Sequence, residues 1–118
     1  MNKISGIGID IVNVSRFKIK LLEDNLKFYE KIFSDSEIEY CKKFKSPYEH
    51  FAGIFAVKEA LIKSIDEDIG LLEIVIEHEN NKPVIKLKTP FNEKYRFIVS
   101  ISHEKEFAVG VVVSEKIK

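Results

Sequence analysis

The sequence contains one cysteine, no tryptophan and no excess of either charge, with 19 Lys and Arg residues against 19 Asp and Glu residues among 118. The single cysteine, Cys41, excludes a disulfide within one chain and a cysteine-based zinc site. It fits a reducing compartment, so we expect a cytoplasmic protein. The charge balance gives no general attraction to nucleic acid or to an anionic membrane, and we expect neither as a partner.

The sequence also lacks a long apolar run. Crossing a bilayer takes about 20 consecutive apolar residues, and glycines and Asp10 interrupt the start MNKISGIGIDIV before a signal-peptide core forms. The chain is 45% hydrophobic and 32% charged, which is typical of a globular protein rather than a disordered one. Its length suits one core, so we expect a single domain over residues 1–118.

A strand is predicted over residues 3–12. Isoleucine alternates with other residues through ISGIGIDI, which is the period of a strand. The opposite face then carries Gly6, Gly8 and Asp10. Two positions without a side chain beside a carboxylate leave room for a ligand or another backbone to come close.

Helices are predicted to follow this strand. Ser34 and Glu37 have the spacing of a capping box, and Pro47 is typical of the first turn of a helix. The predicted helices cover residues 14–33 with a break near Asp24-Asn25, a short segment from the capping box to about Phe44, and a long segment from about Tyr48 to Ile65.

The rest of the chain is predicted to form strands. LEIVIEHE and PVIKLK flank a turn at Asn80-Asn81-Lys82, where asparagine tolerates positive φ. After a helical turn over residues 91–94, RFIVSIS and FAVGVVVS form two further strands. A strand, several helices and then antiparallel strands indicate the α+β class. Valine on both faces of the last strand needs cover on both sides, which in a short chain suggests a subunit interface.

The long predicted helix raises a question. Its stretch FAVKEALIKS is apolar in almost every direction, yet it carries Lys58, Glu59 and Lys63. Ionised groups rarely leave water without a partner. Either this part of the helix reaches solvent, or a charged group meets it. Glu59 and Lys63 are four residues apart, so an ordinary ion pair along the helix is one interpretation.

Several weak signals together point to metal chemistry. Asp10 and Glu59 are the kind of carboxylate pair that holds Mg²⁺ while substrate phosphates and water complete its octahedron. Neighbouring lysines neutralise phosphate oxygens, and His103, just after a strand, is suited to donate a hydrogen bond or move a proton. The sequence has no Walker-type loop and no G-x-G-x-x-G, so an ordinary nucleotide-binding fold is not indicated.

Three motifs make the sequence similar to a known family. Gly8-Ile9-Asp10 followed by Arg16 resembles the family's G-x-D motif with its arginine. Residues 55–64 match F-[AS]-x-K-E-A-x-x-K-[AS], and Ser100-Ile101-Ser102-His103 matches S-[IVL]-S-H. In this order and over essentially the whole length, the chain resembles the holo-acyl-carrier-protein synthases, the small 4'-phosphopantetheinyl transferases of bacteria.

The resemblance implies an enzyme of fatty-acid synthesis. Such an enzyme transfers 4'-phosphopantetheine from coenzyme A to a serine of apo acyl carrier protein and releases 3',5'-ADP. The resemblance implies Mg²⁺ held by Asp10 and Glu59, a leaving phosphate stabilised by Lys63, and contacts of His103 with phosphate or water. It does not identify the general base.

The same resemblance implies binding residues and partners. Lys58 is expected to bind substrate. Arg16, Lys18 and Lys20 are expected to form a docking patch for an acidic acyl carrier protein, with a solvated helix face as the alternative for the two lysines. Similar synthases are trimers with active sites between subunits, so the resemblance implies a homotrimer.

Two departures from the family pattern affect coenzyme A binding. Ile54 stands where many relatives have arginine, which removes one expected anion contact. Asp66-Glu67-Asp68 stands where Gly-Thr-Gly is common. Three acids near a phosphate would repel it, so either this loop points away or the affinity for coenzyme A is weakened.

The residues alone leave two other functions open. A magnesium-dependent nuclease or phosphoesterase also uses an acid pair, a lysine and a histidine, and it would hydrolyse its substrate without coenzyme A. A non-catalytic oligomeric binding module, in which Glu59 and Lys63 only pair with each other, would bind no Mg²⁺ and tolerate Glu59→Gln.

Overall fold

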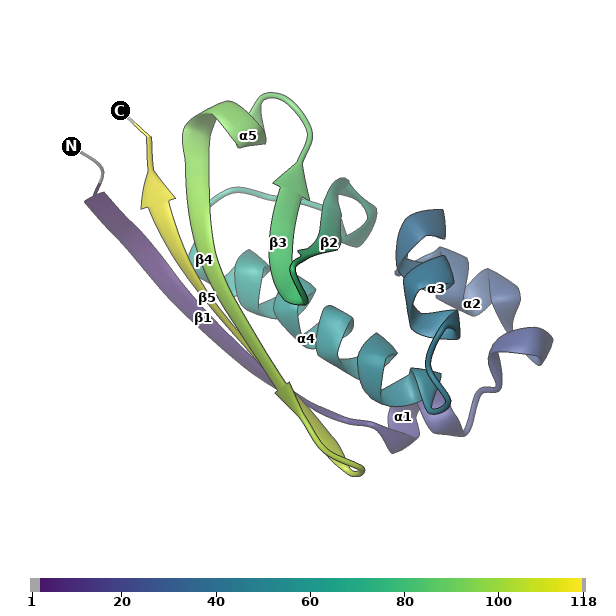
Figure 1. Cartoon of the computed structure of the whole chain (residues 1–118). Helices are drawn as coiled ribbons and strands as arrows, with labels where there is room; N and C mark the ends of the chain where they lie inside the picture. The colour runs from purple at the N-terminus through teal and green to yellow at the C-terminus, as the bar shows by residue number, and fades with distance from the viewer. Residues whose placement is uncertain (1–2, 118) are drawn as a thin grey trace.

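The computed structural model describes residues 3–117, and its longest helix lies across one face of a three-stranded sheet (Figure 1). This is an α+β fold, as the sequence predicts. In chain order the elements are β1 (Lys3–Asn13), α1 (Ser15–Lys18), the 3₁₀ turn η1 (Leu22–Asp24), α2 (Leu26–Glu30), α3 (Asp35–Lys42), α4 (Pro47–Ser64), the 3₁₀ turn η2 (Leu71–Glu73), β2 (Ile74–Glu79), β3 (Lys82–Leu87), α5 (Phe91–Lys94), β4 (Tyr95–His103) and β5 (Phe107–Lys116).

The main sheet is antiparallel and has the order β1-β5-β4. Asp10 of β1 lies opposite Gly110 of β5, which in turn lies opposite Ile101 of β4. β2 and β3 form a separate hairpin. Figure 1 shows the first and last strands running side by side, with α1, α2 and α3 gathered near one end of α4. The sequence did not predict that β1 pairs with the last strand.

Glycine lets α4 lie directly on the sheet. A Cβ at Gly8 would collide with the carbonyl oxygen of Ala60, and a Cβ at Gly110 would lie 2.6 Å from the backbone nitrogen of Val57. Real Cβ atoms do not come so close, so the helix and the two strands could not approach as they do if these positions carried side chains. This close packing fixes the position of α4 relative to Asp10.

The two faces of β1 have opposite environments, as the alternation in the sequence predicts. Gly8 is buried and faces α4. Ile7, Ile9 and Ile11 are each more than half exposed. Val112, on the helix side of β5, is completely buried. The sheet therefore has one covered face and one apolar face that this single chain leaves open.

An aromatic cluster forms the core between α4 and the short helices. The ring centroid of Phe51 lies 4.7 Å from that of Tyr29 and 4.8 Å from that of Phe33. Phe17 of α1 contacts all three rings and also Phe55. Full burial of such a side chain stabilises the fold by about 1.5–3 kcal/mol. The cluster attaches α1 and α2 to the first half of α4.

The helical region after β1 is broken more often than the sequence predicts. The expected break near Asn25 is present, but α1 also ends early. The Tyr29 hydroxyl lies 2.9 Å from the carbonyl oxygen of Phe17 and 2.7 Å from that of Lys20. It donates to carbonyls that a continuous helix would bond to later amides, so a tertiary contact overrides the local helical propensity.

The other predicted elements are confirmed. Ser34 accepts from the backbone of Glu37 at 3.2 Å, and the Glu37 carboxylate accepts from the backbone of Ser34 at 2.8 Å, which completes the capping box. α4 has Pro47 in its first turn. Asn80 and Asn81 have φ of 53° and 63°, so both adopt the left-handed conformation that this short hairpin turn requires.

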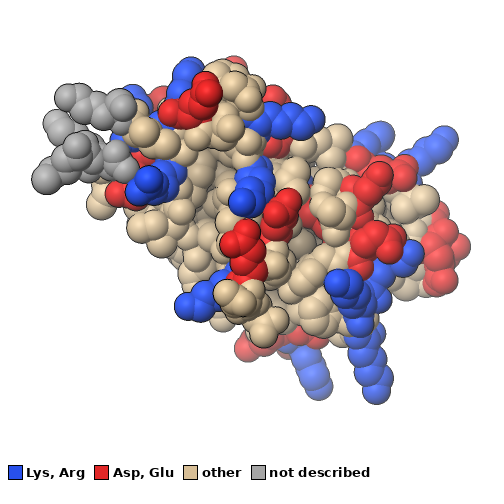
Figure 2. All heavy atoms as spheres, turned by 45° about the horizontal axis from the view of Figure 1, so that its top comes forward, with Lys and Arg blue, Asp and Glu red and all other residues tan. Residues whose placement is uncertain are grey.

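The surface has mixed charge. Figure 2 shows blue Lys and Arg side chains interspersed with red Asp and Glu side chains on the face it presents. This agrees with the equal numbers of the two charges in the sequence. Over residues 3–117, no helix combines the length and the apolar character needed to cross a membrane.

Candidate active site

Asp10 and Lys63 meet where β1 crosses α4. Gly8 precedes Asp10 by two residues on the same face of β1, and a Cβ at Gly8 would lie 3.1 Å from the Cβ of Lys63. The Lys63 Nζ lies 3.1 Å from Asp10 Oδ1 and 3.0 Å from the carbonyl oxygen of Ile9. The side chain of Asp10 is 20% exposed and that of Lys63 is 54% exposed. A carboxylate and an ammonium group therefore lie together at a junction of β1 and α4 that is open to solvent.

Glu59 lies one helical turn before Lys63, on the same face of α4. Its side chain is partly buried, and among residues 3–117 it has no hydrogen-bond or ion-pair partner. Lys63 pairs with Asp10 instead. The ordinary ion pair along the helix, which the spacing of Glu59 and Lys63 allows, is not formed. Both carboxylates thus neighbour the same lysine, and one of them has no partner within the described chain.

The residues at this junction fit a hard divalent cation. Mg²⁺ is commonly held by one or two carboxylates, while phosphate oxygens and water fill its other positions. Asp10 and Glu59 supply two carboxylates. Within the described part of the chain there is no group of three or more His, Cys, Asp and Glu side chains arranged to hold a metal by themselves. Two carboxylates suit a cation whose other positions are filled by phosphate oxygens and water.

His103 lies in a different place, at the end of β4. Its Nδ1 is 3.2 Å from Glu49 Oε1, and its ring centroid is 4.8 Å from that of His50. Both partners belong to the first turn of α4, one turn before Gly53, where an added Cβ would lie 3.0 Å from Cγ2 of Ile101. His103 on β4 lies opposite Ala108 on β5, and β5 separates β4 from β1.

The single chain therefore separates the predicted site residues into two clusters. β5 lies between β1 and β4, and two strand spacings amount to about 10 Å. Gly53 and Lys63 are also ten residues apart on α4, which is about 15 Å along a helix. Asp10, Glu59 and Lys63 form the first cluster, and His103 with Glu49 and His50 forms the second.

The predicted substrate contact of Lys58 is wrong. Its side chain is completely buried, and its Nζ donates to Glu37 Oε1 at 2.7 Å and to the carbonyl oxygens of Ile32 and Leu71 at 2.7 and 2.9 Å. An ammonium group has three protons, and all three are used. Lys58 joins α4 to α3 and to the turn before β2. Its role is structural, and the charged group that meets it inside the fold is Glu37.

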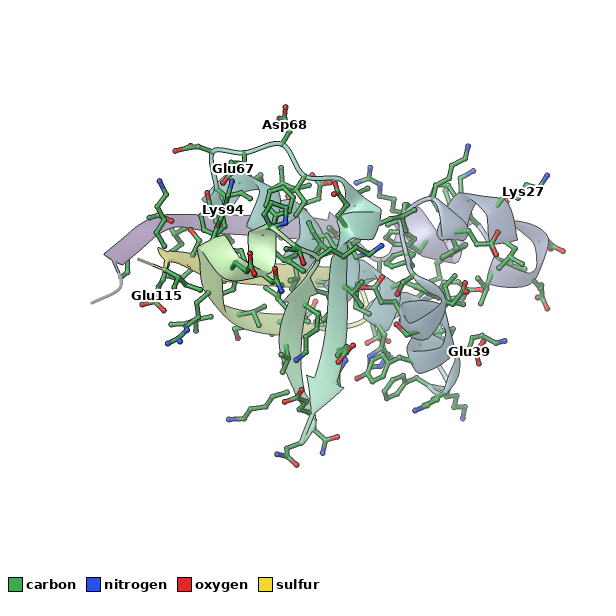
Figure 3. The ribbon with its side chains drawn as sticks, turned by 90° about the horizontal axis from the view of Figure 1, so that it is seen from above. Lys27, Glu39, Glu67, Asp68, Lys94 and Glu115 are labelled. Atoms are coloured by element: carbon green, nitrogen blue, oxygen red, sulfur yellow. The ribbon has the colours of Figure 1, made fainter. Side chains whose placement is uncertain are left out.

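The acidic loop after α4 is fixed through Glu67. The Glu67 carboxylate accepts from Lys94 Nζ at 2.9 Å and from the Tyr95 hydroxyl at 2.7 Å. First the Tyr95 hydroxyl and then the Lys94 ammonium lower the pKa of Glu67 below its ordinary value. Figure 3 shows Glu67 and Lys94 together, with Asp68 pointing outward from the loop. Glu67 is thus turned toward α5 and the start of β4, and its charge is neutralised there.

The basic side chains of α1 are exposed. The guanidinium carbon of Arg16 lies 4.9 Å from the centre of the Phe55 ring, a cation–π contact that holds its stem against α4. Lys18 and Lys20 are also exposed, and the Nζ of Lys20 lies 5.0 Å from the centre of the Phe28 ring. These cations remain accessible to an acidic partner.

Sequence reasoning missed the partners that the fold brings to Lys58 and His103. Glu37 was expected only to cap α3, although a buried lysine in an apolar helix requires a buried acid somewhere in the fold. His50 was not singled out, because its neighbour His103 is 53 residues away in the sequence and only the fold brings them together. No local pattern predicts such a long-range pair.

Comparison with known proteins identifies a family. The family model described as the 4'-phosphopantetheinyl transferase superfamily matches residues 6–112. A holo-[acyl-carrier-protein] synthase of Thermodesulfovibrio yellowstonii is 42% identical over 113 residues, which cover 93% of this chain and 97% of that protein. A holo-(acyl-carrier-protein) synthase of Bacillus anthracis, solved in complex with CoA (3',5'-ADP), is 36% identical with a TM-score of 0.79 and covers 97% of this chain and 98% of that one.

A second solved structure agrees with the first. A holo-[acyl-carrier-protein] synthase of Helicobacter pylori in complex with coenzyme A is 37% identical with a TM-score of 0.77, and the match covers 92% of this chain and 98% of that one. The span matched by the family model runs from β1 to β5 and includes both clusters. Because most of the chain is matched in sequence and in fold, it belongs to the 4'-phosphopantetheinyl transferase superfamily.

Proposed function

We propose that this protein is a holo-[acyl-carrier-protein] synthase of fatty-acid synthesis. It transfers 4'-phosphopantetheine from coenzyme A to a serine of apo acyl carrier protein. The serine oxygen forms a bond to the phosphorus that carries pantetheine, the bond from that phosphorus to 3',5'-ADP breaks, and the serine loses its proton. The observation that carries the proposal is the ion pair between Asp10 of β1 and Lys63 of α4, one helical turn after Glu59, in a chain similar along its length to such synthases.

The two carboxylates and the lysine have different roles. Asp10 and Glu59 hold Mg²⁺, which when bound neutralises part of the pyrophosphate charge that would repel an attacking oxygen. Lys63 stands beside Asp10 with more than half of its side chain exposed, so its ammonium is placed to stabilise charge on the leaving phosphate. The carbonyl of Ile9 and the carboxylate of Asp10 fix the orientation of that ammonium. A positioned cation of this kind lowers the barrier without forming a covalent bond.

We propose further that the enzyme works as a homotrimer with active sites between subunits. His103 lies away from Asp10 within one chain, so His103 of a second copy is available to complete the site. The open face of the sheet supports this arrangement, because contiguous apolar surface of this kind marks interaction sites. Its most exposed side chains are Ile4, Ile7, Ile9, Ile11 and Ile98.

The protein works in the cytoplasm and docks the carrier protein through basic side chains. The whole chain, residues 1–118, acts as one catalytic domain in the cytoplasm, where a single free and buried cysteine is compatible with reducing conditions. Arg16 and Lys18 of α1, with Lys20 just after it, receive the acidic acyl carrier protein. Complementary charge of this kind mainly increases the rate of encounter.

One assay tests the function. The protein is incubated with coenzyme A, apo acyl carrier protein and Mg²⁺, and the carrier is then weighed by mass spectrometry. We expect the carrier to gain one phosphopantetheine group, and we expect EDTA, Asp10→Ala and Glu59→Gln each to abolish the gain. An unchanged carrier with well-folded protein would reject the proposal, and hydrolysis of phosphoesters without coenzyme A would identify a phosphoesterase instead.

A further inference from the structure

An acidic loop, residues 66–68, begins three residues after Lys63, the lysine of the candidate site. Its two outer acids are exposed, whereas Ile65 and Ile69 on either side of it are each 8% exposed. Because one residue spans at most about 3.6 Å of chain, the Cα of Asp66 lies within roughly 11 Å of that of Lys63. Carboxylates on so short a tether would compete with a phosphate for the Lys63 ammonium unless they are held away from it.

Glu67, the middle acid of the loop, is held by two donors. The Tyr95 hydroxyl lies 2.7 Å from Oε2, and the Lys94 Nζ lies 2.9 Å from Oε1, so each carboxylate oxygen has its own donor (Figure 3). Tyr95 is 5% exposed, and its ring stacks on Phe97 with centroids 5.9 Å apart. The backbone carbonyl of Lys94 accepts from the backbone of Ile117 at 2.9 Å. Both donors are therefore fixed to the main sheet.

Strand register shows how far these donors lie from the candidate site. Tyr95 lies opposite Lys116 of β5, whereas Asp10 lies opposite Gly110 of the same strand. Six residues along a strand amount to about 20 Å, which is longer than any side chain reaches. Salt at physiological strength screens charges over about 8 Å. Bound at Tyr95, the Glu67 carboxylate is thus drawn toward the end of the sheet remote from Asp10.

Tyr95 keeps its proton at neutral pH. The hydrogen bond to Glu67 is the largest cause that raises the pKa of Tyr95 to about 12, followed by burial and by the charges of Glu67 and Asp66. The same hydrogen bond, followed by that of Lys94, lowers the pKa of Glu67. The hydroxyl therefore remains a donor, and the carboxylate remains a charged acceptor.

We propose that Tyr95 and Lys94 are positioning residues for coenzyme A binding, which hold the acidic loop away from the pyrophosphate and do not touch the coenzyme. This inference rests on the proposed function. A released Glu67 is attracted by the ammonium of Lys63, four residues earlier, and repels the phosphates that the same ammonium is expected to meet. In water, one added negative charge at about 8 Å from a doubly charged pyrophosphate raises the Kd by about fivefold.

Calorimetric titration with coenzyme A in the presence of Mg²⁺ measures this effect. Lys94→Met removes one donor of an exposed pair, and Tyr95→Phe removes the other while it keeps the ring and the net charge. We expect each to raise the Kd for coenzyme A by about two- to fivefold, with an unchanged kcat for carrier modification at saturating coenzyme A, because only ground-state binding is weakened.

Removal of the acid separates positioning from a general structural role. Adding Glu67→Gln to Lys94→Met or to Tyr95→Phe should restore the Kd, whereas Glu67→Gln alone should leave it nearly unchanged, because the tethered charge lies far from the site. A merely structural role predicts no such rescue, since glutamine also loses part of the tether. The control Lys42→Met breaks another exposed pair, that with Glu39, and should not change the Kd.

The outcomes distinguish this inference from the proposed function. An unchanged Kd in either Lys94→Met or Tyr95→Phe, measured on folded protein, would overturn the inference, and so would a raised Kd that Glu67→Gln fails to restore. Coenzyme A binding without carrier modification would overturn the proposed function alone. Absence of coenzyme A binding in the unaltered protein would overturn both.

Discussion

Lys58 Nζ lies 2.7 Å from Glu37 Oε1, and neither side chain has any exposed surface. The other carboxylate oxygen of Glu37 accepts from the backbone of Ile76 at 2.7 Å. Burial lowers the pKa of Lys58, and the charge and hydrogen bond of Glu37 oppose that shift. The pair therefore joins α3, α4 and β2 at one point. Because Glu59 directly follows Lys58, the pair also fixes the part of α4 that carries Glu59.

Removing one partner of this buried pair should strongly destabilise the fold. Lys58→Met leaves the Glu37 carboxylate buried without its cation, and such a change costs about 3–5 kcal/mol. Urea denaturation measures the loss. Adding Glu37→Gln to Lys58→Met should restore part of it, because the uncompensated charge is then gone. As a control, Lys42→Met breaks the exposed pair with Glu39 and should cost less than about 1 kcal/mol. An equal loss in the free energy of unfolding for Lys58→Met and Lys42→Met would contradict this account.

Local patterns in the sequence were sufficient for most elements but not for the contacts between them. The capping box at Ser34 and the Asn80-Asn81 turn are confirmed because each depends on a few adjacent residues. The break after α1 was missed because it depends on the Tyr29 hydroxyl, which reaches back to Phe17. Lys58 was misjudged for the same reason, since its partner Glu37 lies 21 residues away.

Gly8→Ala should separate β1 from α4. The added methyl group would collide with the backbone carbonyl of Ala60, which cannot rotate away as a side chain would. We expect a loss of about 1–3 kcal/mol in the free energy of unfolding and a larger fractional loss of turnover, because Asp10 moves with the strand. Gly70→Ala is the control, since its Cβ would meet only the flexible side chain of Glu73 at 3.4 Å. Denaturation and carrier-mass assays on both variants check the prediction.

Lys63→Ala should slow turnover without removing Mg²⁺. The lysine is exposed, so the fold is unaffected, but the leaving phosphate loses a positioned cation, which typically lowers kcat about 10²–10³-fold. Asp10 also loses the ammonium that competes with a metal, so the concentration of Mg²⁺ needed for half-maximal rate should not rise. The control Lys86→Ala removes an exposed lysine of β3 and should keep full turnover. Unchanged turnover in Lys63→Ala would rule out its proposed role.

The candidate site was only partly accessible from the sequence. Asp10 and Glu59 could be placed on a strand and a helix, but nothing local states that Gly8 lets those elements touch, so their proximity came from the family resemblance. The separation of His103 follows from the strand order β1-β5-β4, which pairs the two ends of the chain. Long-range pairing of this kind is set by the whole fold rather than by any window of sequence.

Acid should destabilise the protein through its partly buried histidines. Burial lowers the pKa of His78 below its ordinary 6.5 in the folded state. Above pH 6.5 the ring is neutral in both the folded and the unfolded state, so it does not change the free energy of unfolding. Below pH 6.5 the His78 ring binds a proton in the unfolded chain but not in the folded chain. The free energy of unfolding therefore falls with the pH until the lower pKa of the folded state is reached. The urea midpoint should therefore drop as the pH falls below 6.5, and it should drop less in His78→Phe; an equal drop would contradict this linkage.

Charge on the open face of the sheet should dissociate the proposed trimer. Ile9 is 59% exposed in the single chain and lies between Ile7 and Ile11 on the edge strand β1, on that face. In a trimer that covers this face, Ile9→Glu would bury a carboxylate without a partner, which costs several kcal/mol, roughly 3–5 as for a broken buried pair. Sedimentation velocity should give a monomer for Ile9→Glu and a trimer for the control Ile19→Glu, whose isoleucine directly follows α1 and is 79% exposed. Carrier modification should be lost with the trimer while the helical circular dichroism signal persists, because α4 packs on the opposite face. An active monomer at the assay concentration would show instead that one chain carries a complete site.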